Sequence, residues 1–322
     1  MVVETAFRPA NPTLRRAYGV AATAFLLVFV AWTRATWLGP LATRWFVDIT
    51  STLIPLGVGA LAIARARHLP SERRSAWFLL GAAVLAWALG NMAWSYLELW
   101  AQRGIPVLER TVPFPSLADV GYLLLIPLAA SALLIMVVGG TAVTTRMRTL
   151  LDGLLIASAM LFLGWALVLR PIVHYAIQQE GVLAQLVSLA YPMGDIVLLS
   201  LLILVATRVD RPVQASLAWL GLGLMCFTLA DIGFWVQVAQ GTYQTGSWSD
   251  PGWVAGFLII GYAGLRPLPV VAQGVPRRPA WSSPRCRWCR SSWPPCPRST
   301  WRSTKAASAP SCSGTPSSSS CW

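Results

Sequence analysis

The amino-acid sequence predicts an all-α integral membrane bundle of about eight transmembrane helices. Hydrophobic residues make up 56% of the 322 residues and charged residues only 11%, whereas about a quarter of an ordinary soluble domain is charged. The mean hydropathy is +0.59. The apolar residues also fall in runs of about 20, which is the length that a helix needs to cross a bilayer. Together these observations exclude a soluble globular protein.

Eight apolar segments meet the length requirement for a membrane-spanning helix. They lie at about 15–36, 45–64, 76–100, 118–138, 149–170, 182–206, 213–239 and 248–266. The first follows two arginines, as the core of a signal peptide would. Its apolar stretch exceeds the usual ~7–15 residues and no small-x-small cleavage site closes it, so we interpret it as a helix. The chain thus divides into an N-terminal segment (1–14), an eight-helix transmembrane domain (15–266) and a basic, low-complexity tail (267–322).

Basic residues are distributed unequally between the two ends of these segments. The arginines within 8–16, 65–74, 146–148 and 208–211 outnumber those that flank the other side, which are Arg34, Arg44, Arg103, Arg110 and Arg170. Because positive charge is retained in the cytoplasm, we expect a multi-pass protein of the bacterial inner (plasma) membrane with both termini cytoplasmic. The net charge of +13 is then mainly a topology signal, and we expect no nucleic-acid partner.

Two parts of the chain resemble each other, because in each a polar residue late in one helix is followed by Asp-x-Gly-aromatic at the start of the next. In the first part the polar residue is Asn91 and the motif is Asp119-Val-Gly-Tyr122. In the second part the polar residue is Asp231 and the motif is Asp250-Pro-Gly-Trp253. An offset of four helices preserves orientation, so the pattern predicts a parallel four-helix repeat. Chance similarity among apolar helices explains the pattern equally well at this stage.

The tail from residue 276 to 322 contains no Val, Leu, Ile, Met or Phe, so it is predicted to be disordered. Every residue type in it except lysine has a codon with G or C at the second position. Lys305 is the one lysine among 25 basic residues, which points to a gene rich in G and C. A one-base slip would produce this composition, so we expect a frameshifted or artefactual end in place of a lost downstream domain. Cys286-Arg-Trp-Cys289 has the Cys-x-x-Cys spacing of zinc-binding and redox-active sites, but we attribute it to the same frameshift.

Three polar residues within the predicted spans are candidates for a ligand-binding site: Asn91, Asp195 and Asp231. Asp195 lies about twelve residues into its helix, near the bilayer centre, where an Asp costs about 2.5–3.5 kcal/mol, and Pro192 is expected to kink that helix. If the helices are neighbours, these side chains converge, with Tyr191, Trp94 and Phe234 as walls. Such a site suits a small polar or cationic ligand from outside. The alternative is a hydrogen bond between helices that only fixes packing.

Other acidic residues have structural explanations. Asp119 and Asp152 follow Ser116 and Thr149 with capping-box spacing, and Asp250 precedes a proline as an N-cap residue does. We therefore assign Asp119, Asp152 and Asp250 to helix caps. Glu98 lies near a helix end beside a tryptophan, where interfacial anchoring accounts for it.

No sequence motif of a hydrolase, a phosphate-binding loop or a metal-dependent active site occurs in the chain. We therefore predict no enzymatic activity, no catalytic residues, no cofactor and no metal site. The expected partner is the lipid bilayer, with a small extracellular ligand and a homodimer as further candidates.

The run from about 77 to 266 resembles the membrane-sensor region of actinobacterial signalling proteins that carry diguanylate cyclase domains. The resemblance rests on Gly90-Asn91-x-x-Trp94, Pro115-Ser-Leu-Ala-Asp119-x-x-Tyr122, Leu151-Asp152-Gly153, Ala190-Tyr191-Pro192-x-Gly194-Asp195, Ala230-Asp231 and Asp250-x-Gly-Trp253. In that family the helices precede a cytoplasmic domain that makes cyclic di-GMP from GTP. This chain has neither a Gly-Gly-Asp-Glu-Phe nor a Glu-Ala-Leu motif, so catalysis, GTP and magnesium are not carried over.

Three functions are compatible with these observations. The leading one is a sensory or anchoring module that would pass a signal to a now-missing cytoplasmic domain. The second is a small-solute or proton transporter or channel that uses the midplane acids. An intramembrane enzyme is the weakest, because no nucleophile–base pair can be identified.

Overall fold

The computed structural model describes residues 12–69, 71–101, 103–105, 112–138, 143–166, 170–178, 181–208 and 211–266. Within these ranges every regular element is a helix, which confirms the all-α fold class. The elements are α1 (Pro12–Ala35), α2 (Gly39–Arg67), α3 (Ser71–Ser95), the π-helical turn η1 (Tyr96–Trp100), α4 (Leu117–Val138), α5 (Val143–Gly164), α6 (Arg170–Ile177), α7 (Val182–Arg208), α8 (Arg211–Ala239) and α9 (Asp250–Gly264). The predicted tail, with Cys286 and Cys289, lies outside the described residues.

Six of the described helices are long and apolar enough to cross a membrane, so the chain is a multi-pass membrane protein. These spans are Pro12–Ala35, Gly39–Ala66, Arg74–Trp100, Leu117–Met136, Val182–Thr207 and Ser216–Ala239. The fifth expected span forms a helix whose apolar part is Leu151–Gly164, and the eighth forms the short helix α9. Helix α9 has 15 residues and rises about 22 Å, which is less than the ~30 Å of a hydrocarbon core.

The fifth expected segment, at 149–170, differs most from the structure. Helix α5 begins at Val143 and ends at Gly164, and the separate helix α6 follows with only eight residues. Hydropathy marks where a helix becomes apolar, not where its backbone hydrogen bonds begin, so the predicted start came too late. Thr149 therefore lies inside α5. Because a capping box requires the first residue at a helix N-terminus, the assignment of Asp152 as a cap is wrong.

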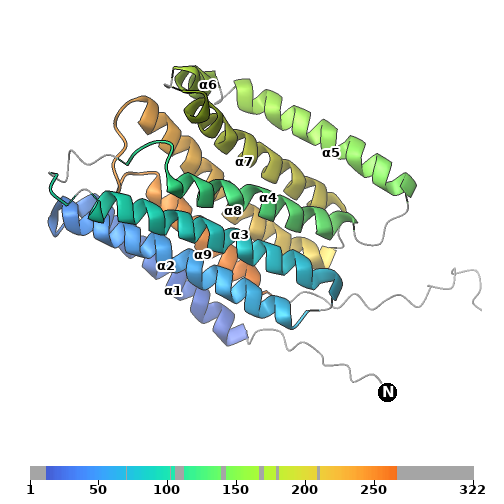
Figure 1. Cartoon of the computed structure of the whole chain (residues 1–322). Coiled ribbons are helices and arrows are strands. Elements are labelled where there is room, and N and C mark those ends of the chain that lie inside the picture. Colours follow the sequence, from blue (N-terminus) through green and yellow to red (C-terminus); the bar gives the residue numbers. More distant parts are fainter. Residues whose placement is uncertain are drawn as a thin grey trace, which may run out of the picture. The chain divides into compact units, whose positions relative to one another are not determined.

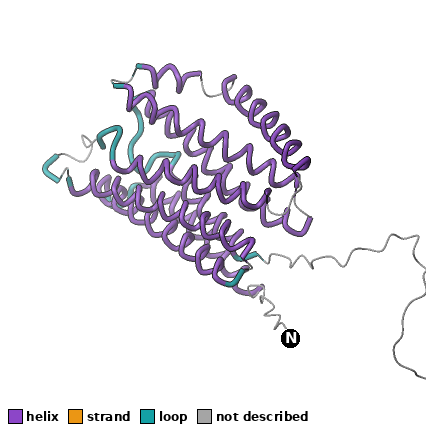
Figure 2. Tube along the Cα trace, turned by 45° about the vertical axis from the view of Figure 1, so that its right-hand side comes forward, coloured by secondary structure: helices purple, strands orange, loops and turns teal. Residues whose placement is uncertain are grey.

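The long helices pass back and forth between two ends of the bundle (Figures 1 and 2). At one end Tyr18 of α1 contacts Tyr262 of α9, with 6.4 Å between ring centroids, and Arg65 Nη2 donates to the Arg266 carbonyl oxygen at 2.6 Å. At the opposite end, which we call the connector end, lie the connectors 112–116 and 240–249. Helices α3 and α8 both run towards the connector end, and α4 and α9 both run away from it, as a parallel repeat requires.

Glycines allow the closest helix pairs to approach. A Cβ atom added to Gly121 of α4 would lie 2.5 Å from the Gly90 Cα atom of α3. In α8 and α9, a Cβ atom on Gly256 would lie 2.9 Å from the Gly223 carbonyl oxygen. Small residues at helix crossings are typical of membrane bundles, where close van der Waals packing drives association.

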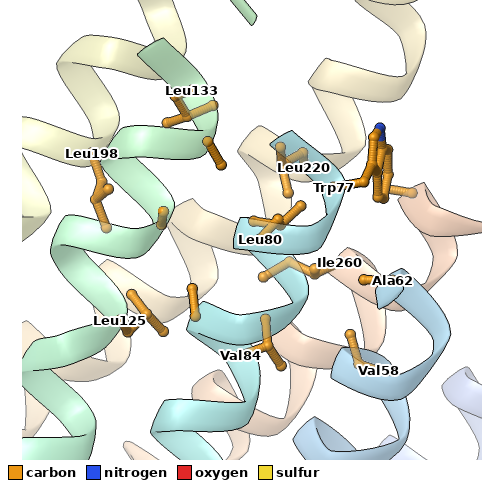
Figure 3. Packing of buried hydrophobic residues seen from close by; sticks show 14 of the residues in the cluster. Val58, Ala62, Trp77, Leu80, Val84, Leu125, Leu133, Leu198, Leu220 and Ile260 are labelled. Carbon is orange, nitrogen blue, oxygen red and sulfur yellow. The ribbon is translucent and has the colours of Figure 1, made fainter. Parts of the chain in front are cut away.

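The apolar core lies between α2, α3, α4, α7, α8 and α9. Its buried side chains include Leu80, Val84, Leu125, Leu198, Leu220 and Ile260 (Figure 3). Trp87 joins this core to rings from three other helices, at centroid distances of 5.2 Å to Tyr122, 5.9 Å to Phe227 and 4.7 Å to Phe257. This aromatic cluster borders the cavity that lies between it and the connector end.

Candidate functional site: a cavity lined by carboxylates and aromatic rings

A cavity of about 90 Å³ lies among the helices towards the connector end, with residues of both connectors in its wall. Its lining includes all six residues that the sequence analysis proposed for a ligand site: Asn91, Trp94, Tyr191, Asp195, Asp231 and Phe234. These residues come from α3, α7 and α8, so the structure brings together side chains that are up to 143 positions apart by their numbers. It also places Asp119 and Asp250, which were assigned to caps, in the same wall.

The two similar sequence regions make equivalent hydrogen bonds at this cavity. The Tyr122 hydroxyl of α4 donates to Asn91 Oδ1 of α3 at 3.2 Å. At the corresponding positions, Trp253 Nε1 of α9 donates to Asp231 Oδ1 of α8 at 2.6 Å. The polar residue late in the first helix is therefore held each time by the aromatic residue of the Asp-x-Gly-aromatic motif. Chance similarity does not explain why both pairs share this contact.

The two motif aspartates are also held in equivalent ways. The Ser116 backbone N–H donates to Asp119 Oδ2 at 2.6 Å, and the Gly246 backbone N–H donates to Asp250 Oδ2 at 2.6 Å. A tyrosine hydroxyl approaches each from the other side: Tyr191 at 2.6 Å from Asp119 Oδ1, and Tyr243 at 3.4 Å from Asp250 Oδ1. Each carboxylate thus fixes a helix start with one oxygen and receives a phenol on the other.

Asp119 and Asp250 hold their helix starts from different positions. Ser116 Oγ accepts the Ala118 backbone N–H at 3.3 Å, so Ser116 and Asp119 form a reciprocal capping box at the start of α4. Asp250 is not an N-cap residue, because Ser249 occupies that position and Asp250 is the first residue of α9. The motif proline takes the second helical position, and the Asp250 side chain reaches back to the connector rather than forward into the helix.

Burial raises the pKa of Tyr243 in the connector well above its ordinary value, and the Asp250 carboxylate adds to this rise. The phenol therefore stays protonated at neutral pH. It remains a hydrogen-bond donor towards Asp250, and its ring stays neutral where it packs against Phe234 at a centroid distance of 4.6 Å.

Sequence analysis missed an ion pair beside the cavity. Arg44 Nη1 of α2 contacts Glu98 Oε1 of η1 at 2.8 Å, and both side chains are about 95% buried, with exposures of 4% and 5%. Glu98 Oε2 accepts hydrogen bonds from Thr245 at 2.8 Å and Trp94 Nε1 at 3.2 Å. The expectation that Glu98 anchors at the interface is therefore wrong. It lies in a π-helical turn, where the changed winding alters the face that each side chain takes.

Asp48 of α2 is a cavity residue that sequence analysis did not single out. It is 3% exposed and lines the cavity. Its backbone oxygen accepts a hydrogen bond from Asn91 Nδ2 at 3.3 Å, and the same nitrogen donates to Thr52 Oγ1 at 2.9 Å. The Asp48 Oδ2 atom is buried and has no hydrogen-bond partner among the described residues. An acid early in a span is a sequence signal for such a site, because each intramembrane carboxylate is costly.

The lining is strongly asymmetric in charge. Five carboxylates face the cavity: Asp48, Asp119, Asp195, Asp231 and Asp250. Within the described part of the chain, none of the lining residues is basic, and Arg44 is already paired with Glu98. Asp195 lies inside α7, three residues after Pro192 of the same helix. The arrangement concentrates negative charge in an apolar, aromatic surrounding, where electrostatic interactions are little screened.

Comparison with known proteins adds no assignment: the chain matches no protein family, no curated protein sequence and no solved structure.

Proposed function

We propose that this chain is an integral membrane sensory module that binds a small ligand in the carboxylate-lined cavity and passes the signal to a cytoplasmic domain. The cavity carries the proposal, because it gathers polar side chains from six helices at a depth where polar groups are costly unless they serve packing or binding. The sequence resemblance to membrane-sensor regions of cyclic di-GMP signalling proteins supports the same function.

The cavity wall also suggests how binding would be transmitted. Its residues come from both repeat-related pairs, α3–α4 and α8–α9, and from α2 and α7. A ligand that contacts both pairs would favour one relative placement of them over another, and a ligand shifts a conformational equilibrium only through such a difference in affinity. Helix α9 ends at the pole opposite to the connector end, so a shift of α9 would move the start of the segment that follows it.

The experiment uses the full chain in lipid nanodiscs. Four tryptophans line the cavity: Trp87, Trp94, Trp235 and Trp253. A bound ligand is therefore expected to change the tryptophan emission in a saturable way. Asp195→Asn and Asp231→Asn, which nearly preserve shape, are expected to abolish that response, whereas Asp152→Asn on α5, outside the cavity wall, is the matched control. An unchanged response in both cavity variants would leave these residues a packing role only.

A transporter is the second candidate, because a parallel repeat with acids near the bilayer centre is also how many transporters are built. Flux measurements in proteoliposomes separate the two. A sensor binds the ligand that changes the fluorescence but does not carry it or protons across the membrane. Flux that disappears in Asp195→Asn would replace the sensory function by transport.

We further propose that both termini lie in the cytoplasm of a bacterial cell, with the connector end outside. Reporter fusions after Glu72, Thr145 and Asp210 are expected to report cytoplasm, and fusions after Gly104, Gln178 and Gln244 the outside. Reversal at two or more sites would contradict this orientation. A shifted reading frame beyond codon 275 is expected to encode a linker and a globular domain, and a frame that encodes nothing foldable would remove the signalling output.

A further inference from the structure

The carboxylates of the cavity differ in how completely the protein satisfies them. Asp119 accepts three hydrogen bonds, from the Ser116 backbone, the Ser116 hydroxyl and Tyr191. Asp250 accepts bonds from Gly246, the serines beside it and Tyr243. Asp231 accepts one bond from Trp253. These donors are neutral, so the protein supplies hydrogen bonds but little positive charge.

Asp48 is the exception that points to a ligand. Its Oδ2 atom is buried without a partner among the described residues, and the side chain forms part of the cavity wall. A buried acceptor without a partner costs about 1–3 kcal/mol, and more when it is charged. A cation in the cavity would remove that cost at Asp48 and would also offset the charges of Asp195 and Asp231, which share the wall.

The remaining wall is aromatic. Phe234 packs against Tyr243 at 4.6 Å and against Trp253 at 5.8 Å between ring centroids, and Trp94 lies 6.4 Å from Tyr243. Aromatic faces attract cations, and they do so most strongly where water is excluded. Such rings favour a cation that carries apolar groups, because they also bury alkyl surface.

The volume of the cavity and the placement of its acids narrow the chemical class of the ligand further. The cavity of about 90 Å³ is smaller than the ~150 Å³ that accommodates benzene, so it fits a group of about five non-hydrogen atoms. Calcium needs about six to eight oxygen ligands around one point. In the part of the chain that the structure describes, no group of three or more His, Cys, Asp or Glu side chains is placed to hold a metal ion. A compact organic cation fits the cavity volume and does not require several oxygen ligands around one point.

We propose that the cavity binds a small organic ammonium ion, a protonated short alkylamine or a methylated ammonium group, with its charge against Asp48, Asp195 and Asp231 and its alkyl groups on the aromatic wall. This assignment rests on the proposed sensory function and names its ligand class. The rings and the acids act together: the carboxylates select the charge, and the rings select alkylated nitrogen over a strongly hydrated inorganic ion.

The test titrates the full chain in nanodiscs with four probes at constant ionic strength, followed by tryptophan fluorescence and calorimetry. The probes are tetramethylammonium, the neutral tert-butanol of the same heavy-atom number, the anion trimethylacetate and sodium. Tetramethylammonium is expected to bind saturably and more tightly than tert-butanol by about tenfold or more, because its partners are charged. Trimethylacetate and sodium are expected not to compete with it.

Variants make the result specific to the cavity. Asp48→Asn is expected to weaken tetramethylammonium binding by about tenfold or more and to leave tert-butanol binding unchanged, whereas Asp152→Asn changes neither. Asp195→Asn serves as a second cavity variant if Asp48→Asn does not fold, as judged by its melting temperature in the same nanodiscs. Tetramethylammonium binding that survives in the folded cavity variants would overturn the assignment.

The probes also separate the two proposals. Saturable binding of tert-butanol or trimethylacetate that equals or exceeds that of tetramethylammonium would reject the ammonium class but keep a ligand-binding cavity. Displacement of tetramethylammonium by sodium with the same dependence on Asp48 would assign the site to an inorganic cation. If none of the probes binds, the ammonium assignment fails, and the sensory function then depends on whether any other small solute changes the tryptophan emission.

Discussion

In the helix pair α3–α4 the aromatic donor Tyr122 meets the neutral amide of Asn91, whereas in α8–α9 Trp253 meets the carboxylate of Asp231. The hydrogen-bond pattern is the same, but the acceptor is an amide in one pair and a carboxyl group in the other. The contact from the Trp253 indole N–H to Asp231 is the shorter of the two, 2.6 Å against 3.2 Å. The shared contact therefore joins the two helices of each pair in the same way, while the residue type at its acceptor sets how many acids each pair adds to the cavity. The first pair adds Asp119 and the second adds Asp231 and Asp250.

The two pairs differ also in how tightly their backbones approach. Gly121 of α4 faces the backbone of Gly90, whereas at the corresponding positions Gly252 of α9 faces the Ala230 side chain, 2.8 Å from its Cβ atom if a Cβ were added. The first pair also carries a buried ion pair at its connector end, because Arg44 binds Glu98 directly after α3. The first pair is therefore the more closely packed of the two at its motif glycine.

Removal of the cation is expected to have the largest effect. Arg44→Met leaves Glu98 as a buried charge without its ion-pair partner, so the free energy of unfolding falls by about 3–5 kcal/mol. Equilibrium unfolding in mixed micelles measures this. The double variant Arg44→Met/Glu98→Gln is the control and is expected to recover most of the loss, since no charge then remains unpaired. A loss below about 1 kcal/mol would mean that the pair is solvated as surface pairs are.

A methyl group at the two motif glycines tests the difference in packing. Gly121→Ala places its Cβ against the Gly90 backbone, which cannot move aside, so we expect a loss of about 1–3 kcal/mol in stability. Gly252→Ala places its Cβ 2.8 Å from the Ala230 Cβ atom, a less severe overlap than the 2.5 Å at Gly121, and is expected to cost less. Melting temperatures of both variants, measured in the same detergent, show which substitution lowers stability more. If Gly252→Ala is the more damaging of the two, the α8–α9 pair is the tighter one.

The smallest expected effect is that of Tyr122→Phe, which is compared with the loss of the equivalent donor in the second pair. Tyr122→Phe removes a hydroxyl bonded to a neutral amide and is expected to cost about 0.5–1.5 kcal/mol. Trp253→Phe removes a donor to a carboxylate, for which about 1.5–3 kcal/mol is typical, in addition to lost ring volume. Trp87→Phe, which deletes an indole at the border of the core, corrects for that volume term. Equal costs for Tyr122→Phe and the corrected Trp253→Phe would mean that Asp231 is uncharged.

Much of the site was accessible from sequence because its signals are local. Asn91, Asp195 and Asp231 interrupt long apolar runs, and a polar residue there must face protein rather than lipid. The repeated Asp-x-Gly-aromatic motif placed Tyr122 and Trp253 at equivalent helix starts. The convergence of these residues, by contrast, depended on which helices are neighbours, and no single-sequence pattern specifies that.

The sequence by itself determined the all-α membrane bundle, its long apolar helices and several of the polar residues that they bury, because hydropathy and chain length act along each segment separately. Only the tertiary structure decided that Asp48 and Glu98 are buried, that Asp119 and Asp250 both hold a helix start and line a cavity, and that Asp152 lies outside it. The physical reason is that burial of a side chain depends on the rotation of its helix and on the neighbours it meets. A π-helical turn or an earlier helix start changes both without leaving a signal in composition.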